Sequence, residues 1–168
     1  MTRPRRPAAR GTLPRTTKAR ATPAKQLAAF IAKFDPAVAR VIRATRRSLR
    51  RRVPTAIEIV YDNYNFFVIG YSTTERPSDC VFSIAAAANG VGLSFYHGAT
   101  LPDPEGILLG SGAQNRFIRL PSASVLDAPP VEALLKAAVA QARHPLPATG
   151  SGHTIIRSVS AKQRPRRR

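Results

Sequence analysis

Residues 57–96 read IEIVYDNYNFFVIGYSTTERPSDCVFSIAAAANGVGLSFY, and most of the fold follows from them. Short segments rich in β-branched and aromatic residues alternate with polar connections, which is the pattern of consecutive strands. The segments are residues 57–61, 66–71, 80–86 and 91–96. Asn89-Gly90 lies between the last two, and Asn-Gly between apolar runs is a strong hairpin signal. The stretch therefore predicts antiparallel strands that follow one another closely along the chain.

Helices are predicted on both sides of these strands. Thr22-Pro23 and Asp35-Pro36 each place a capping side chain before a proline at the first helical position. The second of these helices has one apolar face with helical spacing. That face consists of Val38, Val41, Ile42, Thr45 and Leu49. A fifth strand is predicted over 115–120, and a last amphipathic helix follows Pro129-Pro130.

The predicted fold class is α+β, with the element order ααβββββα. Because the strands are linked mostly by hairpins, we expect a largely antiparallel sheet of about five strands. The apolar faces of the helices need a surface to cover, so the helices are expected to pack on one face of the sheet.

The basic charge is concentrated near the ends of the chain. The formal net charge is +18, and residues 1–26 and 146–168 contain eight and six basic residues respectively, with no acid. Such acid-free segments, with few apolar residues, predict disordered tails that bind polyanions. The predicted organisation is a basic disordered tail over 1–21, one domain over 22–145 and a second basic disordered tail over 146–168.

The composition also bears on compartment and membranes. A single cysteine, Cys80, excludes an internal disulfide, and the first 20 residues contain no apolar segment typical of a secretory signal. Between Asp79 and Asp103 no residue is charged, but Asn89-Gly90 interrupts this run, so two strands are expected rather than a membrane span. A cytoplasmic protein without a membrane partner is the expectation.

Two sets of residues are candidates for binding. If the strands pair in sequence, a polar and aromatic group converges at one end of the sheet and forms a small pocket. It consists of Tyr61, Asp62, Tyr64, Asn65, Tyr96, His97 and Arg116. The alternative is that the tyrosines pack at the core edge and Asp62-Asn63 serves only the turn.

The second set is a row of arginines on the helix after Pro36. Arg40, Arg43, Arg47, Arg50 and Arg51 lie opposite its apolar face. Arginines without nearby acids repel one another, so they are candidates for contacts with nucleic-acid phosphates. A solvated helix face is the equally weighted alternative.

Other chemistry finds little support in the sequence. His97, His144 and His153 have no second ligand at helical spacing, so no metal site and no cofactor are predicted. Cys80 is in phase with Phe82 and Ile84, which predicts a buried, inert thiol rather than a nucleophile.

The chain resembles the YdhG-like family, small bacterial domains of unknown function. The matching motifs are Arg52-Val53-Pro54 after the helix pair, 61–65 with the sequence YDNYN, 101–104 with LPDP, and 109–112 with LGSG before the strand at 116–120. The resemblance covers about residues 25–142 and implies helices packed against an antiparallel sheet. Part of the family is described as frataxin-like iron chaperones, a role that would require oxygen ligands. Only nine acidic residues are present, so this role is the least favoured.

Three functions therefore remain open. The preferred one is a non-enzymatic accessory module that binds a small ligand or protein, with arginine-rich tails that bind nucleic acid non-specifically. The second is an enzyme or small-ligand binder that uses the cluster around Tyr61–Asn65 and Tyr96–His97. The third is the iron chaperone implied by the resemblance.

Overall fold

The computed structural model describes residues 21–168 as one six-stranded sheet with helices on one face. The helices are α1 (Pro23–Ala32), α2 (Pro36–Arg52) and α3 (Pro129–Ala140), and the strands are β1 (Ile57–Asp62), β2 (Phe67–Ser72), β3 (Cys80–Ala87), β4 (Gly90–Phe95), β5 (Arg116–Arg119) and β6 (Thr154–Val159). In space the strands follow the order β5-β4-β3-β2-β1-β6. All neighbours are antiparallel except β1 and β6, which are parallel.

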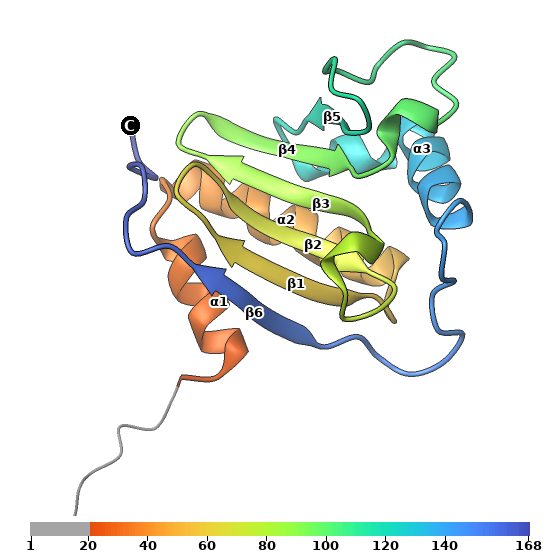
Figure 1. The fold of residues 1–168 in the computed structure, drawn as a ribbon. Helices are drawn as coiled ribbons and strands as arrows, with labels where there is room; N and C mark the ends of the chain where they lie inside the picture. Colours follow the sequence, from red (N-terminus) through yellow and green to blue (C-terminus); the bar gives the residue numbers. More distant parts are fainter. Residues whose placement is uncertain (1–20) are drawn as a thin grey trace, which may run out of the picture.

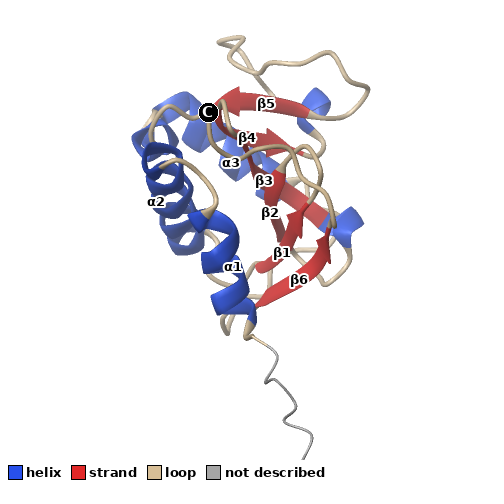
Figure 2. Cartoon of the chain, turned by 90° about the vertical axis from the view of Figure 1, so that its left-hand side faces the viewer, coloured by secondary structure: helices blue, strands red, loops and turns tan. Residues whose placement is uncertain are grey.

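Seen from the side, the three α-helices of the described residues lie on one face of the sheet (Figures 1 and 2). The predicted α+β class is therefore confirmed. The five predicted strands are all present, and each differs from its prediction by no more than one or two residues at its ends.

The core lies between the helices and the covered face of the sheet. Alternate strand residues such as Ile69, Ile84 and Leu93 are fully buried there, opposite Ile42 and Leu49 of α2. Burying a side chain of this kind contributes about 1.5–3 kcal/mol relative to leaving it in water. The apolar side chains on one side of the strands therefore fix which face of the sheet meets the helices, and along β4 buried and half-buried residues alternate strictly.

Local signals in the sequence explain the helix starts and the central hairpin. The hydroxyl of Thr22 accepts a hydrogen bond from the backbone N–H of Lys25, so it caps α1. In the β3–β4 hairpin, Ala87 pairs with Gly90, whose φ is +142°. This backbone conformation favours glycine, so the Asn89-Gly90 turn forms where it is predicted.

The prediction of a disordered tail over 146–168 is wrong. Residues 154–159 form β6, which pairs with β1 at the edge of the sheet (Figure 1). The segment after β6 then crosses the β1–β2 connection, where the side chain of Arg166 is 3 % exposed and its guanidinium contacts the carboxylate of Asp62 at 3.1 Å. The domain therefore extends to the last residue rather than ending at 145.

Two contacts between residues that are distant in sequence order this segment. Ile155 and Ile156 pair with Ile59 and Val60, which extends the apolar ladder of β1. The carboxylate of Asp62 is buried, and a buried charge requires a partner. The basic composition of the segment conceals both contacts.

The predicted tail over 1–21 lies, except for Ala21, outside the described residues. Within residues 21–168, no helix has the length and apolar character needed to cross a membrane.

Candidate functional site

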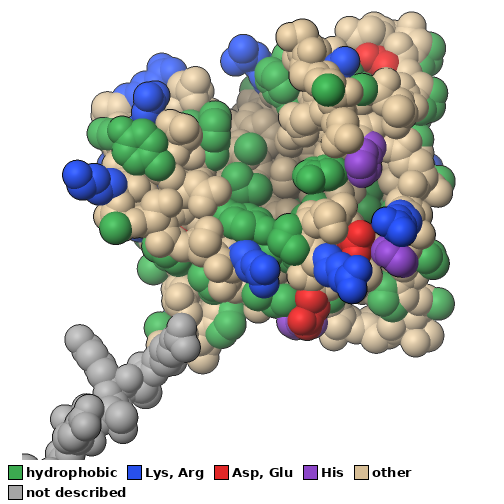
Figure 3. Space-filling view, in the orientation of Figure 1, with side chains coloured by type: hydrophobic (Ala, Val, Ile, Leu, Met, Phe, Trp, Pro, Cys, Tyr) green, Lys and Arg blue, Asp and Glu red, His purple; other side chains and the backbone are tan. Residues whose placement is uncertain are grey.

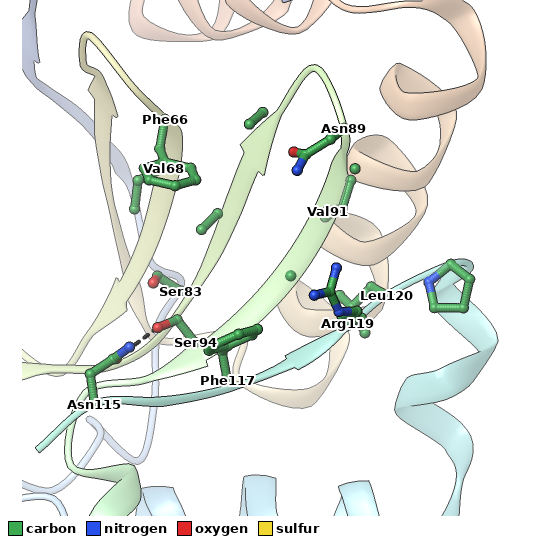
Figure 4. A pocket seen from close by; sticks show the side chains of 15 residues that line it. Phe66, Val68, Ser83, Asn89, Val91, Ser94, Asn115, Phe117, Arg119 and Leu120 are labelled. Atoms are coloured by element: carbon green, nitrogen blue, oxygen red, sulfur yellow. Dashed lines mark hydrogen bonds between the residues drawn. The ribbon is translucent and has the colours of Figure 1, made fainter. Parts of the chain in front are cut away.

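The open face of the sheet contains a hollow of about 740 Å³. Small residues of β3 and β4 on the side away from the helices form its floor: Ser83, Ala85, Gly92 and Ser94. Larger side chains border it, namely Phe66 and Val68 on the β2 side and Phe117 and Arg119 on the β5 side (Figure 4). We call this region the sheet hollow, and the space-filling view shows it as a depression in this face of the molecule (Figure 3).

The hollow follows from residue size along neighbouring strands. The register places Ser83 opposite Ser94 and Ala85 opposite Gly92, so four small residues lie side by side. Gly92 also allows a close approach to β5, since a Cβ there would lie 3.2 Å from the carbonyl oxygen of Ile118. A volume of this size is typical of small-molecule sites, which measure about 300–1,000 Å³.

The polar groups of the hollow are few. The hydroxyl of Ser94 donates a hydrogen bond of 2.7 Å to the side-chain oxygen of Asn115 (Figure 4). Arg119 is exposed and is the only charged residue among the described residues that line the hollow. The rings of Phe66 and Phe117 supply flat apolar surface, and Phe66 is half-exposed. This combination is suited to a flat molecule that carries a negative charge.

A second group of residues adjoins the hollow on the same sheet face. Cys80 lies over Gly70, where a Cβ would be only 2.9 Å from the sulfur. Burial raises the pKa of Tyr61, the ionised forms of Cys80 and Tyr96 raise it further, and Arg157 opposes these effects. Tyr61 is therefore protonated at neutral pH and can donate a hydrogen bond rather than act as a base.

Cys80 is only partly buried, so the prediction that it is buried holds in part. Burial raises the pKa of its thiol to about 11, although a hydrogen bond with Ser72 lowers it. A free cysteine has a pKa of about 8.5, so at pH 7 Cys80 has roughly 300-fold less thiolate.

We therefore expect slow alkylation of Cys80 in the folded protein. Labelling with a maleimide at pH 7, followed by mass spectrometry, should be at least about 100-fold slower than labelling of the same protein in denaturant, because only the thiolate reacts. Comparable rates in the two conditions would show that this thiol is activated.

The predicted pocket around Tyr61 and Tyr96 does not form as one group. Tyr61 and Asp62 end β1, and the register places Asp62 in a row with Phe67, Ala86 and Val91 at one end of the sheet. Tyr96 follows β4 at the opposite end, where its N–H donates to the carbonyl of Val81. Each hairpin reverses the chain, so the backbone ends of β1 and β4 lie at opposite ends of the sheet and the group does not converge as a whole, although the phenols of Tyr61 and Tyr96 remain close enough for the charge of one to raise the pKa of the other.

The remaining members of that group are likewise separated. Asp62 faces the helices, where Lys33 approaches it to 2.6 Å. Tyr64 is exposed with the guanidinium of Arg164 over its ring, and the carbonyl of Asn65 accepts a hydrogen bond from Arg166.

At the other end of the sheet, the rings of Tyr96 and His97 meet edge to face with centroids 5.0 Å apart. Arg116 donates to the carbonyls of Gly112 and Asn115. The structure therefore brings together Tyr96, His97 and Arg116, and separately Tyr64 and Asn65.

The arginine row on α2 is present but divided. Arg40, Arg43, Arg47 and Arg51 are exposed. Arg50 instead contacts the buried carboxylate of Glu58 at 2.9 Å.

Sequence reasoning missed Arg46 and Glu58, which form the centre of a buried polar network. The carboxylate of Glu58 also accepts two hydrogen bonds of 2.8 Å from Arg46 and one of 2.8 Å from Thr154. Burial alone would raise the pKa of Glu58, but the hydrogen bonds and charges of Arg46, with Thr154 and Arg50, outweigh it, so the pKa lies below the ordinary value. The only available signal was that Glu58 occupies an inward-facing position of a strand.

No group of three or more histidine, cysteine, aspartate or glutamate side chains within the described part of the chain is arranged to hold a metal ion. Comparisons of the chain with models of known families, with curated proteins and with solved structures found no match. The resemblance to the YdhG-like family therefore stays a prediction from sequence motifs.

Proposed function

We propose that the protein is a binding module that holds a flat, largely apolar molecule with an anionic group in the sheet hollow. The observation that carries this proposal is the row of four small residues on the floor, Ser83, Ala85, Gly92 and Ser94, bordered by two aromatic rings. A molecule that lies flat against the sheet requires small residues beneath it. A sheet face in contact only with solvent has no such requirement.

The lining residues define the ligand's chemistry. Phe66 and Phe117 offer their rings to an aromatic or otherwise flat body, and such contacts contribute about 0.5–1.5 kcal/mol beyond the area that they bury. Arg119 can pair with a carboxylate, sulfonate or phosphate group through two parallel hydrogen bonds. Ser94 on the floor and its hydrogen-bond partner Asn115 offer further hydrogen bonds.

The absence of activated groups in the hollow supports a binding role rather than catalysis. Among its described lining residues there is no carboxylate, histidine or thiol, which are the usual general bases and nucleophiles. The neighbouring Cys80 has a raised pKa of about 11, so it is a poor nucleophile at neutral pH.

The experiment uses 1-anilinonaphthalene-8-sulfonate, a fluorescent aromatic sulfonate, as the probe. We expect saturable binding to the full-length protein that Arg119→Gln weakens by about 10–100-fold, because a hydrogen bond to a charged group contributes about 1.5–3 kcal/mol. Ser83→Trp should abolish binding, because the indole fills the floor. Arg143→Gln, which removes an exposed arginine outside the hollow, is the matched control and should leave the affinity unchanged.

Circular dichroism of each variant must show the wild-type melting temperature, since the probe also binds partly unfolded proteins. Equal affinities of the Arg119→Gln and Arg143→Gln proteins, or full binding by the folded Ser83→Trp protein, would contradict the proposal.

A further inference from the structure

Helix α2 carries seven arginines and no acid in 17 residues. Like charges three or four positions apart on a helix destabilise it by about 0.2–0.5 kcal/mol per pair. How these charges are neutralised therefore matters for the stability of the helix.

The domain neutralises only the arginines on the inner side of α2. Arg46 and Arg50 contact the buried carboxylate of Glu58, and Arg52 contacts Asp127 at 2.7 Å and Glu132 at 3.3 Å. Four others lie on the outer side: Arg40, Arg43, Arg47 and Arg51, which we call the outer arginine stripe. Within residues 21–168 none of these four forms an ion pair, so their charge is available to an external anion.

The stripe borders a groove of about 450 Å³ between α1 and α2. Ile31 of α1 lines it together with Arg43, Arg46, Arg47, Arg50 and Arg51. The ion pairs with the buried Glu58 fix the positions of Arg46 and Arg50, and the side chains of these arginines remain 30 % and 37 % exposed. Both are therefore oriented before a ligand arrives, which lowers the entropy cost of binding. Because five arginines of α2 line the groove and only the Glu58 carboxylate pairs with any of them, the groove has a strong positive charge.

We propose that this groove binds the phosphate backbone of nucleic acid, DNA and RNA alike. The stripe from Arg40 to Arg51 extends over 11 residues of helix, or about 16 Å. Phosphates on one strand of a duplex rise about 3.4 Å per nucleotide, so the stripe matches roughly five nucleotides. Arginine recognises phosphate through two parallel hydrogen bonds, and such contacts position nucleic acid without reading its sequence.

A membrane surface fits this groove less well. Helices that lie on membranes expose an apolar face beside their basic residues. The exposed large apolar side chains of the described residues all lie outside α1 and α2, and Ile31 is only 3 % exposed. Helices α1 and α2, whose residues line the groove, cover one face of the sheet (Figure 2), whereas the residues of the sheet hollow lie on the other face, so the groove is independent of the proposed ligand site.

The test is fluorescence anisotropy of a labelled 20-nucleotide single strand and the corresponding duplex, as DNA and as RNA. The stripe variant Arg43→Gln/Arg47→Gln/Arg51→Gln in the full-length chain should bind each at least about 10-fold more weakly at low salt. For duplex DNA the slope of log affinity against log salt should fall by about 2.7, or about 0.9 per lost phosphate contact.

Two control triples remove the same charge elsewhere. Arg76→Gln/Arg143→Gln/Lys162→Gln changes exposed residues away from the groove, and Arg3→Gln/Arg5→Gln/Arg6→Gln changes the N-terminal basic segment. Each should reduce the affinity by no more than about threefold. If either control loses as much as the stripe variant, net charge alone drives binding and the proposal is overturned.

Two further outcomes would also overturn the proposal: no binding of any oligonucleotide at low salt, or binding to vesicles of anionic phospholipid without binding to oligonucleotides. The melting temperature of the stripe variant shows whether it is folded. If the triple variant is unstable, the single variant Arg47→Gln replaces it, and its slope of log affinity against log salt should fall by about one unit. Loss of sulfonate-probe binding would leave these results unchanged, so the two proposals fail separately.

Discussion

Removal of residues 154–168 is expected to unfold the domain or to lower its melting temperature by at least about 10–20 °C. The deletion removes β6 from the edge of the sheet and exposes the ladder of β1. It also removes Thr154 from Glu58 and Arg166 from Asp62. Loss of a buried charge partner costs about 3–5 kcal/mol, a large part of the 5–15 kcal/mol that stabilises a typical domain. Thermal melting followed by circular dichroism measures the effect.

A point substitution separates the role of Arg166 from that of the strand. Arg166→Ala should lower the melting temperature by several degrees, because the guanidinium donates to Asp62 and to the carbonyls of Asn63 and Asn65. Arg164→Ala, two residues earlier, removes an exposed side chain whose guanidinium lies over the ring of Tyr64, but it keeps the hydrogen bond from the backbone N–H of residue 164 to the Tyr64 carbonyl, so it should have little effect. Equal melting temperatures of the truncated and full-length proteins would show that β6 does not contribute to the fold.

The substitution Glu58→Gln is expected to lower stability by about 3 kcal/mol, or roughly 6–12 °C in melting temperature. The carboxylate is fully buried and accepts hydrogen bonds from two arginines and a threonine. The neutral amide of glutamine cannot neutralise the positive charges of Arg46 and Arg50. Water that reaches these arginines reduces the loss of stability. Glu132→Gln is the matched control, since its half-exposed ion pair with Arg52 should contribute less than about 1 kcal/mol.

The contribution of Glu58 should also depend on pH. Its pKa in the folded protein lies below the ordinary value of 4.5, so the folded state favours the charged form. The stabilisation is therefore complete above about pH 4.5 and is lost as the pH falls through the lower folded-state pKa. Denaturant unfolding at several pH values should show the difference between wild type and Glu58→Gln shrinking in acid. A difference that is small at pH 7, or that grows in acid, would contradict this account.

The parts of the fold that depend on local patterns were predictable from sequence. Short segments rich in β-branched and aromatic residues, separated by polar connections, identified the strands from β1 to β4. A strand was also predicted at β5, and the apolar face with Ile42 and Leu49 identified α2. Strand β6 was not identified because its pairing is distant: Thr154 meets Glu58 across 96 positions of the chain. Its segment, Thr154–Val159, contains the β-branched residues of a strand, but the surrounding glycines and arginines indicated disorder.

The site was less predictable because it depends on register between strands. Ser83 and Ser94 each look unremarkable in the sequence, and they form a floor only because the β3–β4 hairpin places them opposite each other. The placement of the ends of β1 and β4 at opposite ends of the sheet, in contrast, was available from the sequence by counting chain reversals. The buried partners of Asp62 and Glu58 required the tertiary structure, since neither Arg166 nor Arg46 has a sequence pattern that points to its acid.

The sheet hollow is tested most directly by a titration of ¹⁵N-labelled full-length protein with 1-anilinonaphthalene-8-sulfonate, followed in ¹H–¹⁵N correlation spectra. The account predicts saturable shifts concentrated on the backbone amides of the hollow, including Ser83, Gly92, Ser94, Phe117 and Arg119. The amides of α1 and α2, on the other side of the sheet, should change little. Shifts centred on the helices, or the absence of saturable shifts on β3, β4 and β5, would contradict the claim that this face of the sheet is the binding site.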